Sequence, residues 1–102
     1  MVKGAAINTA KRYIELLKKH DIPVLSAYLF GSFVTGKQHD DSDIDIALVL
    51  DHYVDTPENC LVFLKIRREV DLRIEPHPFD KKDFENGDPF ADAIIKAGIA
   101  LT

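Results

Sequence analysis

The stretch that decides the fold, residues 31–50, reads GSFVTGKQHDDSDIDIALVL. Its second half alternates acidic and apolar residues before it becomes uniformly apolar, as expected of a strand that enters a buried sheet. Asp43 and Asp45 are two positions apart, so on a strand both side chains project from the same face. The first half begins with Gly31 and Ser32 and is rich in turn-forming residues. The stretch therefore predicts a turn followed by a strand that presents two carboxylates side by side.

Helical and strand patterns alternate on both sides of this stretch. Apolar side chains recur at three and four positions in some segments and alternate with polar side chains in others. The predicted elements are, in order, a helix over residues 5–19, a strand over 24–30, a helical turn over 32–35, a strand over 43–50, a helix from Pro57 toward Glu69, a strand over 70–76 and a helix from Pro89 to Gly98. This order predicts an α/β (α+β) fold in which helices flank a small mixed β-sheet.

Length and composition narrow the class of protein. The 102 residues predict one domain over residues 1–102, and 46% hydrophobic and 29% charged residues are typical of a folded chain. Thirteen Lys and Arg against seventeen Asp and Glu give a net charge of −4, so direct nucleic-acid binding is not expected. The only cysteine, Cys60, excludes an internal disulfide. The longest nearly apolar stretch, residues 22–30, is too short to span a membrane, and we expect a cytoplasmic protein.

The two aspartates of the central strand predict a divalent cation between them. Like charges this close repel unless a cation lies between them, and hard oxygen ligands suit Mg²⁺ or Mn²⁺. Asp71, on the strand predicted over residues 70–76, supplies a third carboxylate, and Glu75 on the same face competes with it for this role. The turn at Gly31 offers backbone amides that hold phosphate oxygens.

Other interpretations of these residues fit less well. The acidic segment has no Lys or Arg from residue 38 to 64, and such a run is usually a solvated loop. An EF-hand that starts at Asp41 would place Ile46 where glycine is needed. Cys60 is interpreted as part of a helix core. The histidines form no i, i+4 pair and are expected at the surface or the edge of the core rather than on zinc. They are His20, His39, His52 and His77.

Gly31-Ser32, ten residues and then Asp43-Ile44-Asp45 resemble the Gly-Ser-x10-Asp-x-Asp signature of the DNA polymerase β nucleotidyltransferase superfamily. The local sequence is most similar to the minimal nucleotidyltransferases, the MNT proteins that are paired with HEPN-domain partners in toxin–antitoxin systems. The resemblance spans about residues 25–75 and implies a nucleotidyltransferase fold, similar to the polymerase β palm.

The resemblance also implies roles for individual residues. Gly31 and Ser32 would bind the β- and γ-phosphates of a nucleoside triphosphate, ATP. The three carboxylates would bind two Mg²⁺ ions and form the catalytic centre, the third of them also helping to deprotonate the attacking hydroxyl. They are Asp43, Asp45 and Asp71. Family members often carry an arginine just before the glycine that is Gly36 here, where this chain has Thr35. Lys37 would bind the nucleotide in its place, as a point charge rather than a bidentate fork.

The implied function is AMP transfer to a partner protein. HEPN-paired family members transfer AMP from ATP to a hydroxyl, typically of a tyrosine, on the HEPN toxin and so act as antitoxins by AMPylation. Two alternatives stay open: an antitoxin with little or no catalysis that neutralises its partner by binding, and a transferase that acts on a small molecule or an RNA end. The sequence leaves open which nucleotide is used and whether the chain forms a homo- or hetero-oligomer.

Overall fold

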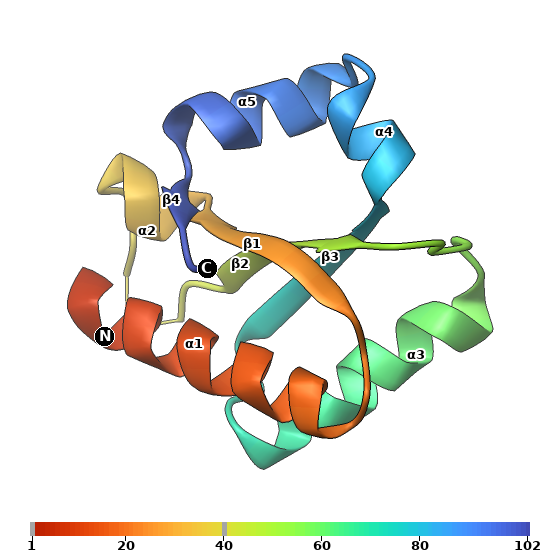
Figure 1. Cartoon of the computed structure of the whole chain (residues 1–102). Coiled ribbons are helices and arrows are strands. Elements are labelled where there is room, and N and C mark those ends of the chain that lie inside the picture. The colour runs from red at the N-terminus through yellow and green to blue at the C-terminus, as the bar shows by residue number, and fades with distance from the viewer. Residues whose placement is uncertain (1, 40) are drawn as a thin grey trace.

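A four-stranded mixed sheet forms the centre of the computed structural model, which describes residues 2–39 and 41–102 (Figure 1). The elements are α1 (Lys3–Lys19), β1 (Val24–Phe30), α2 (Ser32–Thr35), β2 (Ile44–Leu50), α3 (Pro57–Ile66), the 3₁₀ turn η1 (Arg67–Glu69), β3 (Ile74–Asp80), α4 (Lys81–Glu85), α5 (Pro89–Ala97) and β4 (Ile99–Ala100). The strand order is β3-β2-β1-β4, with β2 and β3 parallel and the other pairs antiparallel. The predicted α/β fold with a small mixed sheet is therefore confirmed.

Helices cover both faces of the sheet, which explains why β2 is almost entirely apolar. In Figure 1, α1 and α3 lie on one side of the sheet and α4 and α5 on the other. Ile44, Ile46 and Leu48 pack into the core on the α1 side, whereas Ala47 and Val49 pack against α4 and α5. The helix predicted over residues 5–19 is confirmed, since the apolar residues that recur at three and four positions are buried. These are Ala6, Ala10, Tyr13, Ile14 and Leu17.

The third predicted strand is wrong in its position along the chain. The sequence pattern placed it at residues 70–76, whereas β3 runs from Ile74 to Asp80. Pro76 and Pro78 both lie inside β3. β3 is the edge strand of the sheet and pairs only with β2, so the missing N–H of a proline leaves no sheet hydrogen bond unmade on the outer side.

Two short elements are absent from the sequence prediction. β4 has two residues and α4 has five, so neither is long enough to show a helical or strand period. β4 returns antiparallel to β1 and gives the sheet a fourth strand where three were predicted. In α3, Phe63 and Ile66 enter the core while Leu61 is 46% exposed. None of the helices in the described part of the chain is long and apolar enough to cross a bilayer.

Candidate active site

The start of β2 positions the two aspartates of the motif. Asp43 precedes the strand and is exposed, and Asp45 is its second residue with 23% of its side chain exposed. Ile44 and Ile46 alternate with them and are fully buried on the α1 side. Because side chains alternate along a strand, Asp45 faces the opposite side of the sheet, the side that carries α5, and Asp43 lies directly before the strand.

The Gly-Ser turn lies directly against Asp45. Gly31 follows β1 with φ 81°, a left-handed conformation that glycine adopts readily. A Cβ atom at this position would collide with the carboxylate of Asp45, so only glycine allows the turn to approach this closely. The pairing of β1 with β2 places Phe30 opposite Asp45 and so delivers the turn to this point. The two halves of the motif, ten residues apart in sequence, therefore meet in space.

The rest of the predicted phosphate-binding segment follows from this turn. Ser32 is half-buried and begins α2, a single helical turn. Gly36 ends that turn with φ 80°, and the backbone N–H of Lys37 donates to the carbonyl of Ser32 at 3.1 Å. The Lys37 side chain is exposed and makes no ion pair with any residue that the structure describes. Its backbone thus stays within one turn of Ser32.

The parallel pairing of β2 and β3 brings a third carboxylate beside Asp45. Glu75 is the pairing partner of Asp45, so the two side chains are neighbours on the same face of the sheet. The Glu75 side chain is 47% exposed, and its Oε2 atom lies 3.7 Å from Nη1 of Arg67 in η1. Glu75 therefore lies directly beside Asp45 in the sheet, with its carboxylate directed toward Arg67.

Asp71, the third carboxylate named from the sequence, has a different position. It lies in the turn before β3, and the pairing with β2 begins only where the N–H of Ile44 donates to the Arg73 carbonyl at 2.8 Å. The Asp71 carboxylate accepts from the backbone N–H of Arg73 at 2.8 Å and from its guanidinium at 3.0 and 2.6 Å. The prediction that Asp71 stands on the third strand is therefore wrong, and its carboxylate is occupied by Arg73.

This pairing makes Asp71 a source of pH-dependent stability. The hydrogen bonds from the Arg73 guanidinium hold the pKa of Asp71 below its usual range, against the opposing effect of burial. A depressed pKa adds stability above the carboxyl's unfolded-state pKa of about 3.9, and that stability is lost as the pH falls through the folded-state pKa.

We therefore expect Asp71→Asn to unfold at lower urea concentration than wild type at pH 7, and the difference to shrink as the pH falls below about 4. Urea titrations across this pH range measure it. Glu85→Gln removes the charge of an exposed carboxylate and serves as the control. Its urea midpoint should equal that of wild type at each pH. Equal midpoints for Asp71→Asn and wild type at pH 7 would contradict the assignment.

The structure adds a residue that sequence reasoning assigned to the surface or the edge of the core. His77 lies on β3 two positions after Glu75, and its Nε2 atom is 3.2 Å from Oδ1 of Asp45. Its ring meets Phe30 edge-on with the centroids 4.9 Å apart. The histidine could have been found from the alternation along β3 had the predicted strand continued past Pro76, because Glu75 and His77 then share a face.

The donor set at this end of β2 fits a magnesium ion. Asp43, Asp45 and Glu75 offer carboxylate oxygens, the ligands that Mg²⁺ prefers in proteins. Within residues 2–39 and 41–102, no three His, Cys, Asp or Glu side chains already converge as a metal site. On β3, the Glu75 carboxylate contacts Arg67 rather than Asp45. To supply a third oxygen donor, the Glu75 side chain would have to turn toward Asp45.

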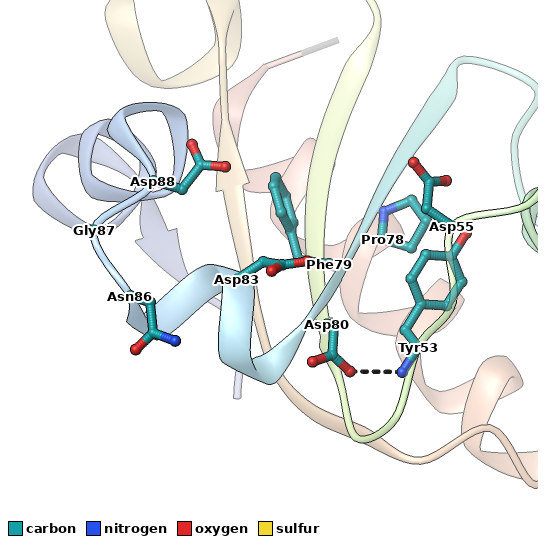
Figure 2. A pocket seen from close by; sticks show the side chains of 9 residues that line it. All are labelled: Tyr53, Asp55, Pro78, Phe79, Asp80, Asp83, Asn86, Gly87 and Asp88. Atoms are coloured by element: carbon teal, nitrogen blue, oxygen red, sulfur yellow. Dashed lines mark hydrogen bonds between the residues drawn. The ribbon is translucent and has the colours of Figure 1, made fainter.

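An acidic hollow of about 460 Å³ lies elsewhere, at the end of β3 (Figure 2). Two of its carboxylates, those of Asp80 and Asp88, have structural partners. Asp80 accepts from the backbone N–H groups of Tyr53 at 2.7 Å and Lys82 at 3.1 Å, and the Lys82 N–H above all holds the pKa of Asp80 below its usual range. Asp88 caps α5 through the N–H of Phe90 at 2.8 Å. These carboxylates stabilise helix starts, and none belongs to the motif.

Solved structures of other proteins share the fold of this chain. A toxin–antitoxin solved with AMP-PNP is 25% identical, with a TM-score of 0.68, and the alignment covers 93% of this chain and 73% of that one. A mutant of the toxin–antitoxin MntA-HpeT is 22% identical (TM-score 0.66, 89% and 70% covered). A nucleotidyltransferase from Sulfolobus solfataricus is 18% identical (TM-score 0.65, 96% and 80% covered). The last two share the fold.

Among curated protein sequences, none matches this chain. The family model described as "Polymerase beta, Nucleotidyltransferase" matches residues 11–102, a span that contains the Gly-Ser turn, the motif strand and β3. The chain therefore belongs to the polymerase beta nucleotidyltransferase family.

Proposed function

We propose that this chain is a Mg²⁺-dependent nucleotidyltransferase that acts as a cytoplasmic antitoxin by transferring AMP from ATP to a hydroxyl, typically of a tyrosine, on a HEPN toxin. The observation that supports the proposal is the close approach of Gly31 to the Asp45 carboxylate, because a turn that bound phosphate there would lie beside a carboxylate able to bind the metal. The similarity to toxin–antitoxin structures, one of them with AMP-PNP, supports the nucleotide and the partner.

Asp43, Asp45 and Glu75 would hold the Mg²⁺ ions. We choose Glu75 over Asp71 because Glu75 is in register with Asp45, whereas the Asp71 carboxylate is bound by Arg73. When bound, Mg²⁺ neutralises charge on the triphosphate and lowers the pKa of the attacking hydroxyl.

The residues of the chain then supply binding, orientation and a proton acceptor. Backbone amides of the turn at Gly31 and the Ser32 hydroxyl bind the β- and γ-phosphates, and Lys37 adds positive charge beside them. The acceptor oxygen forms a bond to the α-phosphorus, the bond from that phosphorus to the oxygen that bridges to the β-phosphate breaks, and pyrophosphate leaves. The hydroxyl proton passes to the Glu75 carboxylate.

The position of the label in ATP tests this reaction. The chain is co-expressed with the protein encoded by the adjacent reading frame, and the purified pair is incubated with Mg²⁺ and ATP labelled at the α- or the γ-phosphate. We expect the partner to acquire the α-label and no γ-label, and EDTA to prevent the transfer, because AMP is transferred and pyrophosphate leaves. Gel autoradiography and the mass of the labelled peptide measure the result. Transfer of the γ-label, or no transfer of either, would contradict the proposal.

Neutralisation by binding alone is the second candidate. Two observations favour it: the three carboxylates are not already converged, and Thr35 stands where family members often carry an arginine. Such a protein would protect cells from the toxin without labelling it. Transfer to a small molecule or an RNA end is a third candidate function. The net charge of −4 disfavours RNA as the acceptor. An α-labelled product that forms in the absence of the partner protein would identify it.

A further inference from the structure

We propose that His77 is a positioning residue that holds the carboxylate of Asp45 in the orientation needed to bind a divalent cation. This inference rests on the proposed function, in which Asp45 is a metal ligand. His77 contacts the Asp45 carboxylate, which also lies against the Gly-Ser turn. It acts on the cation through Asp45.

The two oxygens of Asp45 have different neighbours. An ionised carboxylate only accepts hydrogen bonds, so the 3.2 Å contact requires the proton to be on Nε2 of His77, which donates to Oδ1. The other oxygen, Oδ2, lies over Gly31, at the place that a side chain would otherwise fill. The carboxylate is therefore held between a hydrogen-bond donor from β3 and the turn that follows β1. Each oxygen keeps lone-pair capacity for a cation.

The imidazole is itself held in place by aromatic rings. Phe30, the pairing partner of Asp45 on β1, meets His77 with the ring centroids 4.9 Å apart and the planes at 63°. Phe90 of α5 meets it with the centroids 6.1 Å apart and the planes at 83°. Edge-to-face contacts of this kind fix the plane of a ring. The position of the donor is thus set by the fold rather than by the hydrogen bond alone.

A fixed carboxylate binds a cation more tightly than a mobile one. Partners that hydrogen-bond to metal ligands typically change metal affinity by about 10- to 100-fold when they are removed, because the ligand loses its orientation. Asp45 is only 23% exposed and His77 29%, so water substitutes poorly for the lost donor. We expect an effect of about tenfold, at the lower end of that range.

Two substitutions separate the hydrogen bond from the ring packing. His77→Phe keeps an aromatic ring against Phe30 and Phe90 but has no donor. His77→Gln carries an amide donor in place of Nε2 and has no ring. His52→Gln is the matched control, since His52 also contacts an aspartate, at 3.5 Å, but is 88% exposed and lies beyond the other end of β2.

The experiment measures Mn²⁺ affinity by electron paramagnetic resonance of the free ion, with AMP-PNP present, and the unfolding temperature of each protein. We expect His77→Phe to unfold at the same temperature as wild type and to bind Mn²⁺ about tenfold more weakly. His77→Gln and His52→Gln should bind Mn²⁺ within about threefold of the wild-type affinity. Unchanged Mn²⁺ affinity in His77→Phe would overturn the inference. So would an equal loss in folded His77→Gln, since the ring and not the donor would then matter. If wild type itself bound no Mn²⁺, the proposed function would fail as well.

Discussion

Replacing Asp43 and Asp45 together by asparagine will lower AMP transfer to the partner protein by roughly a thousandfold or more. Asparagine has nearly the same shape as aspartate but no charge, so the variant loses the two carboxylates at the start of β2 that the proposal assigns to Mg²⁺. Metal-ion catalysis contributes several kcal/mol to a transition state, and each factor of ten in rate is about 1.4 kcal/mol. Initial rates of α-label transfer from ATP measure the loss.

The matched control removes the same charge from neighbouring positions. Asp41 and Asp51 are exposed and lie in turns before and after β2, so Asp41→Asn with Asp51→Asn should transfer AMP at nearly the wild-type rate. A wild-type rate in the Asp43→Asn, Asp45→Asn protein would remove the two carboxylates from the mechanism.

The same double variant separates catalysis from neutralisation by binding. If AMP transfer is the basis of the antitoxin effect, cells that produce the partner protein and the Asp43→Asn, Asp45→Asn variant will stop growing, whereas wild type will protect them. Growth curves and co-purification of the two proteins measure this. A variant that transfers no AMP but still protects the cells would establish the second candidate.

Glu75→Gln will lower the rate of transfer by about a hundredfold, the lower end of the range for loss of a positioned proton acceptor. Asp71→Asn will stay within about threefold of the wild-type rate, because Asp71 is held by Arg73 before β3 begins and its loss acts on stability. The difference should appear mainly in kcat, since the proton moves in the transition state rather than on ATP binding.

This pair of variants decides between the two carboxylates that the sequence offered as the third ligand. Single-turnover rates with the purified partner protein, measured at saturating ATP and Mg²⁺, give the comparison without a contribution from product release. A larger loss in Asp71→Asn than in Glu75→Gln, with both proteins folded at the assay temperature, would return the role to Asp71.

Much of the fold follows from local sequence. The apolar repeat of α1 and the strand pattern of β1 specify these elements without reference to the rest of the chain. Two helix starts are equally local: the Thr56 hydroxyl accepts from the N–H of Asn59, and Asp88 accepts from the N–H of Phe90. In both, a capping side chain precedes a proline that cannot donate, so the signal is contained within a few residues.

What the sequence by itself determined about the candidate site was its central pair, because the alternating pattern marks Asp43 and Asp45 as two carboxylates two positions apart at the start of a buried strand. Only the tertiary structure decided what surrounds them. β3 is separated from β2 by α3 in the sequence but pairs with it directly in the sheet. No local sequence pattern therefore shows which residue of β3 will lie beside Asp45. That pairing, made on an edge where proline is tolerated, selected Glu75 and His77 as neighbours of Asp45.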